Sequence, residues 1–281
     1  MKNGKEYGVQ NHEAEIHTYE CLSKFREPLI RSIIESIDIP TGSIGLDAGC
    51  GIGSCTKLLA EFVGEPGKII GLDLSKDFIQ YAKNNYQTTN IQFKEGDINS
   101  LAFSDNSFDW LWSADTVWPG PKELGYPAED PVPIIEEFYR VIRPGGFVVL
   151  LFWSSQKLLA GHPLLEARLN TTSSATAPFR NGMKPTNHIL NGKHWLKKAN
   201  FKDVVVKTYL RDIVAPLSEN DRNALNMLIQ MFWGDSETEV AEVDWKDFKR
   251  LRDPDSNDYI LNNQHYYGFY TYTVFKGIKY S

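Results

Sequence analysis

The chain has 281 residues, a formal net charge of −6, and 42% hydrophobic and 23% charged residues. These values are ordinary for a globular protein, so they exclude a mainly disordered chain, and the negative charge offers nucleic acid no general attraction. Three cysteines without C-x-x-C spacing, a polar N-terminus without the apolar segment of a secretory signal, and no run of about 18 apolar residues predict a cytoplasmic protein with reduced thiols and no membrane partner.

The first half of the chain alternates between helix and strand patterns. Residues 12–39 predict an amphipathic helix that Pro28 breaks or kinks and that ends before Pro40. The first strand is then expected to begin at Ile44, and further strands to cover 68–73, 91–95, 108–112 and 147–153. Helices are expected over 54–63, 75–86 and 133–142. This alternation is typical of a parallel sheet covered by helices on both faces.

Beyond Trp153 the alternation stops. Residues 154–186 predict an irregular insertion, and residues 211–265 predict a second, helical insertion with helices over 217–233 and 244–251. A helix over 187–200 and strands over 201–210 and 266–276 complete the expected elements. The interpretation divides the chain into a helical segment that is a candidate lid (1–40), a cofactor-binding core (41–153), an insertion with a helix (154–200), and the last two strands with a cap (201–281).

The stretch Ile44–Gly53 predicts a buried strand that turns sharply into a helix. Its glycines at 49, 51 and 53 have no Cβ, so a ligand can lie against the main chain near the helix N-terminal amides. Asp47, Asp73, Asp97 and residues 113–115 fall at the ends of successive strands. Since the carboxyl ends of parallel strands meet at one crevice, these groups predict a single binding site, although any one strand-terminal acid is more often a turn former.

Two cofactor classes fit the acid at position 73. Asp73 follows Gly53 by 20 positions, where a carboxylate can accept hydrogen bonds from ribose hydroxyls of either a nicotinamide or another adenosine cofactor. A dinucleotide fingerprint G-x-G-x-x-G requires a sixth-position glycine, which is Ser54 counted from Gly49 and Thr56 counted from Gly51. The pattern therefore disfavours an NAD(P)-dependent oxidoreductase, which remains an alternative together with a non-catalytic binding module.

The segment Leu46–Gly53 resembles the first motif of class I S-adenosylmethionine-dependent methyltransferases. Four later segments resemble further motifs of that family in the same order: Asp73 its ribose-binding acid, Gly96–Ile98 its adenine-contacting segment, Phe108–Asp109 its fourth-strand motif, and Arg140–Gly146 the turn into its fifth strand. The resemblance covers about residues 42–153. It implies an α/β fold with a doubly wound seven-stranded sheet, six strands parallel and the C-terminal one antiparallel, and a helical cap from the insertions.

The resemblance also implies S-adenosyl-L-methionine as cofactor and a set of residues around it. These are Asp47, Gly49, Cys50, Gly51, Gly53, Asp73, Leu74, Asp97, Ile98, Ser113 and Ala114. Asp47 either holds the turn or binds the cofactor amino group through water, and Cys50 fits the turn as a small packing residue. The expected activity is methyl transfer to a small organic acceptor at O, N or C.

Methyl transfer from a sulfonium is an in-line displacement, so no catalytic residue is obligatory and a base is needed only if the nucleophile must lose a proton. His162 and Asp115 are the candidate bases, ahead of His17 and His194, although a lone histidine is more often structural. Trp118 and Trp233 are expected in loops or the cap, enclosing an apolar or cationic acceptor. Asp115 with Asp203 or Asp212 supplies too few oxygen ligands to predict a metal.

Overall fold

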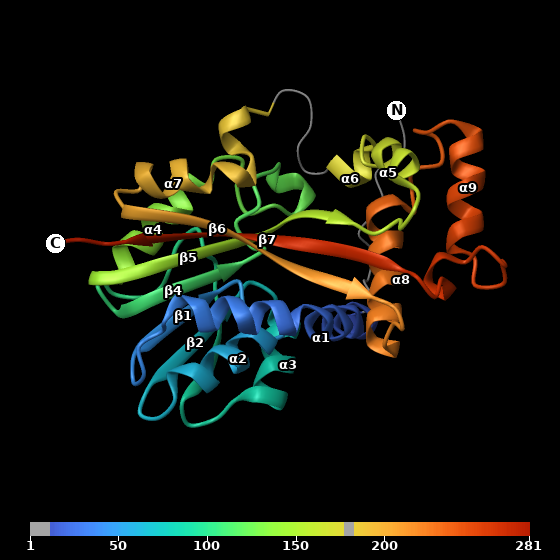
Figure 1. Cartoon of the computed structure of the whole chain (residues 1–281). Coiled ribbons are helices and arrows are strands. Elements are labelled where there is room, and N and C mark those ends of the chain that lie inside the picture. The colour runs from blue at the N-terminus through green and yellow to red at the C-terminus, as the bar shows by residue number, and fades with distance from the viewer. Residues whose placement is uncertain (1–11, 177–182) are drawn as a thin grey trace.

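The computed structural model describes residues 12–176 and 183–281, through which one seven-stranded sheet runs (Figure 1). Its strands are β1 (Ile44–Ala48), β2 (Lys68–Asp73), β3 (Ile91–Glu95), β4 (Phe108–Ala114), β5 (Ile142–Lys157), β6 (Lys202–Val214) and β7 (Tyr267–Ile278). Their order is β3-β2-β1-β4-β5-β7-β6, and β7 runs antiparallel to both of its neighbours. The predicted fold class is confirmed, and the strand order reverses between β1 and β4.

Helices cover both faces of the sheet. The helices α1 (His12–Ile37), α2 (Ser54–Val63) and α3 (Lys76–Tyr86) lie on one face, and α4 (Val132–Val141) and α7 (Gly192–Lys198) lie on the other (Figure 1). Side chains of β5 alternate between two buried clusters: Val149 and Leu151 belong to the α1–α3 side, and Val148 and Leu150 to the opposite side. A strand buried on both faces reads as a continuous apolar run, which is why residues 147–153 carry so strong a strand signal.

The cap lies beyond one end of the sheet and consists of α5 (Pro163–Leu169), α6 (Ser173–Thr176), α8 (Glu219–Trp233) and α9 (Glu242–Arg252) (Figure 1). The prediction of an irregular insertion over 154–186 is wrong in its described part, since β5 continues to Lys157 by pairing with β7, and α5 and α6 follow. Short 3₁₀ turns complete the fold: η1 (Lys122–Leu124), η2 (Pro185–Asn187), η3 (Ile189–Asn191) and η4 (Ile260–Asn262). Turns η2 and η3 replace the first part of the helix expected over 187–200.

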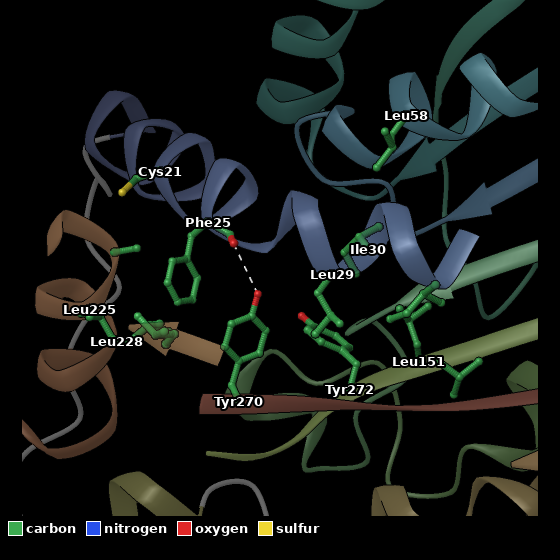
Figure 2. Packing of buried hydrophobic residues seen from close by; sticks show 14 of the residues in the cluster. Cys21, Phe25, Leu29, Ile30, Leu58, Leu151, Leu225, Leu228, Tyr270 and Tyr272 are labelled. Atoms are coloured by element: carbon green, nitrogen blue, oxygen red, sulfur yellow. Dashed lines mark hydrogen bonds between the residues drawn. The ribbon is translucent and has the colours of Figure 1, made fainter. Parts of the chain in front are cut away.

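A break or a kink is predicted at Pro28, and α1 continues through this residue without a break. A proline removes one backbone N–H and presses on the preceding helical turn. In that turn the carbonyl oxygen of Phe25 accepts hydrogen bonds from Arg211 Nη1 and, at 3.3 Å, from the hydroxyl of Tyr270 (Figure 2). Side chains of β6 and β7 therefore bind the helix backbone directly next to the proline.

The apolar face of α1 joins the cap to the sheet. Cys21 and Phe25 face Leu225 and Leu228 of α8, while Ile30 lies further along towards α2 (Figure 2). Arg211, whose guanidinium holds the Phe25 carbonyl, also donates to Asp221 of α8 at 2.6 Å. The position of α1 is thus fixed by α8, β6 and β7 together.

No helix of the described residues is long and apolar enough to cross a membrane.

Candidate functional site

A cavity of about 760 Å³ opens at the carboxyl ends of β1, β2 and β4, where the strand order reverses. Helix α1 supplies one wall with side chains that include Tyr19, Arg26 and Ile30, and β7 supplies Tyr272. Small-molecule sites commonly enclose roughly 300–1,000 Å³ and occur at such reversal points in α/β sheets. The cavity is therefore the place where the chain can hold a ligand of that size.

The structure brings most of the predicted cofactor-binding residues to this cavity. Those that line it are Asp47, Gly49, Cys50, Gly51, Asp73, Leu74, Asp97, Ile98 and Ala114. Gly53 and Ser113 do not line it. A Cβ on Gly53 would lie 2.8 Å from the Cβ of Ala82, and the buried Ser113 hydroxyl donates to the Ala48 carbonyl at 2.9 Å. These two residues hold the elements around the cavity together.

The glycine turn after β1 is built by close approaches of its backbone. Gly49 and Cys50 both donate their N–H groups to the carbonyl of Leu72, at 2.8 and 2.9 Å. Gly49 has φ +82°, and a Cβ there would lie 2.1 Å from Thr116 Oγ1, so only glycine fits. Gly51 also has positive φ, but a Cβ there would meet nothing within 4 Å. The turn thus packs tightly at Gly49 and opens to the cavity at Gly51.

Asp73 connects the glycine turn to helix α3. Its Oδ2 accepts from the Gly51 N–H at 2.8 Å and its Oδ1 accepts from the Ser75 N–H at 2.9 Å. Burial raises the pKa of this carboxyl, and the backbone donors of Ser75 and Gly51 oppose that shift. Ser75 caps α3, accepting from the Phe78 N–H at 3.3 Å. Each oxygen of Asp73 keeps a second lone pair that a ligand hydroxyl can use.

Asp97 and Leu74 form the far end of the cavity. Asp97 Oδ1 accepts from both the backbone N–H and the side-chain amide of Asn99, each at 2.8 Å. Leu74 is 70% exposed although it lies beside the cavity. An exposed leucine next to a hydrogen-bonding carboxylate offers an apolar surface and a polar edge to a flat heterocycle.

Asp47 is a buried acid in the cavity wall. It is 1% exposed, and its Oδ2 accepts from the Thr56 hydroxyl at 2.7 Å. Burial raises the pKa of the Asp47 carboxyl to about 7, against the effect of the Thr56 hydrogen bond and with a smaller contribution from the charge of Asp73. A cationic ligand group close to this carboxyl would favour its ionised form.

We expect Asp47→Asn to stabilise the protein at high pH. The pKa of an aspartate in an unfolded chain is about 3.9, so ionised Asp47 carries a penalty that is absent below about pH 4, grows towards pH 7 and is complete above it, on the order of 4 kcal/mol. The melting temperature of the variant should exceed that of the wild type by about 8 °C at pH 8 and be equal to it at pH 4. Scanning calorimetry at several pH values measures this difference, with the exposed Glu95→Gln as control. A variant that melts below the wild type at pH 8 contradicts the account.

Asp115 lies directly after β4 with φ +51°, an uncommon backbone conformation for an aspartate. Its Oδ1 accepts from the Trp153 N–H at 2.8 Å, and its Oδ2 accepts from Arg26 Nη1 at 3.1 Å and from the Tyr272 hydroxyl. Arg26 Nη1 also donates to the Tyr272 oxygen at 3.2 Å. Arg26, Asp115 and Tyr272 all line the cavity, so the structure assembles one polar cluster from α1, β4 and β7.

The other candidate bases lie away from this cluster. His162 precedes α5 and lines a separate cavity of about 310 Å³ together with residues such as Arg250 and Asn263. The side chain of His17 is 73% exposed, and neither it nor His194 lines the main cavity. Of the candidate bases in the described part of the chain, Asp115 alone lines the main cavity.

The tryptophans do not enclose the cavity, contrary to the prediction. Trp233 is fully buried and its indole N–H donates to Asn170 at 3.1 Å, while Trp118 packs edge-on against Phe152. The aromatic residues that do line the cavity are Tyr19, Phe78, Tyr86, Tyr126 and Tyr272. Among residues 12–176 and 183–281, no group of three His, Cys, Asp or Glu side chains could hold a metal ion.

The chain resembles known proteins over a segment that begins after α1. The model of the family described as "Methyltransferase domain" matches residues 41–205. The demethylmenaquinone methyltransferase of Oceanobacillus iheyensis is 33% identical over 135 residues, which are 47% of this chain and 53% of that protein. The demethylmenaquinone methyltransferase of Staphylococcus epidermidis is 33% identical over 129 residues, 46% of this chain and 50% of that protein. The chain thus spans about half the length of these relatives.

A solved structure shares the fold over a longer stretch. The YcgJ protein of Bacillus subtilis superposes with a TM-score of 0.53 at 15% identity, covering 91% of this chain and 99% of that one. At this identity the likeness establishes the arrangement of helices and strands and nothing about the ligand. It covers a larger share of the chain than the family match over residues 41–205.

Proposed function

Because this chain belongs to the methyltransferase domain family and has S-adenosylmethionine as its cofactor, we propose that it transfers a methyl group to a small organic acceptor bound in the same cavity. The observation that supports this most is the continuity of the 760 Å³ cavity, which runs from Asp73 and Asp97 to Asp115 and Tyr272. It offers one space for a cofactor and an acceptor side by side.

Residues at one end of the cavity suit the parts of the cofactor. Asp73 would accept from the ribose hydroxyls, Asp97 with the Ile98 amide would bind the adenine edge, and the backbone around Gly49 would face the methionine part. The ionised form of Asp47 would compensate the cofactor amino group. When bound, the cofactor supplies an electrophilic methyl group on a sulfonium. The task of the chain is to align a nucleophile with that group and to exclude water from it.

At the other end, Asp115 organises the acceptor side of the cavity. Its carboxylate accepts hydrogen bonds from Arg26, Tyr272 and the Trp153 amide, so both of its oxygens are engaged. Its proposed role is therefore to hold Arg26 and Tyr272 in place. A nucleophile that is already deprotonated, or that loses its proton to water, needs no further base.

The names of the curated relatives specify demethylmenaquinone as their acceptor. Each match covers about half of the chain, 47% and 46% respectively, so it does not carry that acceptor over to this protein. We propose a small molecule of a class set by the residues around Arg26, and no nucleic-acid partner, in agreement with the net charge of −6.

Titration calorimetry with S-adenosylhomocysteine and with NAD tests the cofactor side of the proposal. We expect S-adenosylhomocysteine to bind with a Kd of about 10 µM, equivalent to roughly −7 kcal/mol, and NAD to bind at least 100-fold more weakly. Binding of NAD in preference to S-adenosylhomocysteine would overturn the proposal. Methyl transfer to protein or RNA, with no turnover of small molecules, would overturn its acceptor class.

A further inference from the structure

Arg26 has hydrogen-bond donors that the protein does not use. Its Nε donates to the Leu22 carbonyl at 3.3 Å, and its Nη1 donates to Asp115 and Tyr272. The Nη2 group makes no hydrogen bond to any residue of the described ranges, although the side chain lines the cavity and is only 25% exposed. A guanidinium is a planar fork of donors that matches the two oxygens of a carboxylate. The hydrogen bonds of Nε and Nη1 hold this plane, so they also fix the direction in which Nη2 donates.

The acids of the cavity wall, in contrast, are all engaged. Each accepts at least one hydrogen bond from the described chain: Glu20 from Tyr81, Glu27 from Arg31, Asp47 from Thr56, Asp73 from Gly51 and Ser75, Asp97 from Asn99, and Asp115 from Arg26. On the acceptor side, the negative charge of Asp115 is balanced by Arg26. Both oxygens of Asp115 accept hydrogen bonds from Arg26, Tyr272 and Trp153, so a cationic acceptor would have to compete with these donors, whereas Nη2 of Arg26 is open to an anionic group.

Three exposed lysines surround the same opening. Lys24 of α1, Lys57 of α2 and Lys122 of η1 line the cavity, and none of them forms an ion pair with a residue of the described part of the chain. Lys57 lies 5.9 Å from the ring centre of Tyr86. Unpaired lysines at the rim of a cavity raise the local concentration of anions and speed their entry.

We propose that the methyl acceptor carries a negatively charged oxygen group, such as a carboxylate, and that Nη2 of Arg26 binds this group. The proposal rests on the proposed function and names the substrate class of the same site. It accounts for the unused donor, for the acids whose oxygens already accept hydrogen bonds, and for the lysines at the rim. The positive sulfonium of the cofactor would lie in the same cavity, so an anionic acceptor also balances the charge of the complex.

Three probes of the same size and different charge test the proposal. Benzoate, benzamide and benzylamine are titrated up to 10 mM into the full chain saturated with S-adenosylhomocysteine, and their Kd values are measured by calorimetry. We expect benzoate to bind at least tenfold more tightly than the other two. Arg26→Met should abolish this preference and Arg26→Lys should restore part of it. Arg222→Met is the control, because Arg222 of α8 donates to Asn262 at 3.0 Å and neither residue lines the main cavity.

The cofactor also carries a carboxylate. A second measurement shows whether Arg26 binds this carboxylate or that of the acceptor. S-adenosylhomocysteine and methylthioadenosine, which lacks the amino acid part, are titrated into the wild type and Arg26→Met. We expect both affinities to change by less than threefold. A selective loss of S-adenosylhomocysteine binding, a wild type that does not prefer benzoate, or a preference that survives Arg26→Met would each overturn the proposal. A wild type that does not bind S-adenosylhomocysteine would instead refute the proposed function.

Discussion

Replacing Gly49 by alanine is expected to abolish cofactor binding and to lower the free energy of unfolding by about 3 kcal/mol, the sum of left-handed backbone strain and overpacking. The residue has φ +82°, and the new Cβ would lie 2.1 Å from Thr116 Oγ1. That hydroxyl donates to the carbonyls of Gly49 and Ala114, so its displacement would move the turn and the end of β4 together. Urea denaturation measures the stability loss, and calorimetry with S-adenosylhomocysteine measures the binding.

Gly51→Ala is the matched variant for this experiment. Its φ is also positive, at +53°, but the added Cβ would meet no atom within 4 Å. It should lose about 1 kcal/mol of stability through backbone strain. Its extra methyl group would project from the cavity wall, so it should also weaken the binding of S-adenosylhomocysteine. Equal loss of stability in the two variants would show that the contact with Thr116 is not what requires glycine at position 49.

Asp73→Ala is expected to weaken S-adenosylhomocysteine binding about 100-fold. The carboxylate holds the Gly51 and Ser75 amides and is proposed to accept from the ribose hydroxyls, and each hydrogen bond to a charged group is worth about 1.5–3 kcal/mol. A loss of about 2.7 kcal/mol corresponds to that change in Kd. Titration calorimetry provides the measurement.

Two further variants separate charge from position. Asp73→Asn keeps one side-chain oxygen and should fall between the wild type and Asp73→Ala. Glu95→Ala removes an acid that pairs in register with Asp73 on β3, is exposed and does not line the cavity, so binding should be unchanged. An Asp73→Ala variant that binds within threefold of the wild type would refute the ribose role.

The elements that sequence alone predicted well are those with local signals at both ends. Helix Ser54–Val63 begins after Gly53 and ends at Gly64, and strands β2 and β3 have the predicted bounds because short apolar runs end at turn residues. Most of the residues expected around the cofactor also reach the cavity, since the parallel sheet brings strand ends to one edge whatever their separation along the chain.

The acceptor side could not be predicted in the same way. Arg26 and Tyr272 are 246 positions apart, and each sits in an ordinary pattern, an amphipathic helix and an aromatic-rich strand, that does not say what its polar end meets. Trp233 lies in the cap as expected but does not enclose the cavity, because it is buried and its indole donates to Asn170 at the end of α5. His162 was expected soon after a strand that ends at Trp153. Pairing with β7 extends β5 to Lys157, and His162 lines a separate cavity.

The origin of the cavity walls has a consequence for how such a protein can change over evolution. The cofactor-facing acids lie within residues 41–205, the segment shared with the family, whereas Tyr19, Arg26 and Tyr272 lie outside it, on α1 and β7. On the proposed assignment, Asp115 of the acceptor side lies inside the shared segment, and Arg26 and Tyr272 of that side are encoded outside it. Exchange of the two terminal segments between relatives could give a new substrate range without rebuilding the nucleotide site.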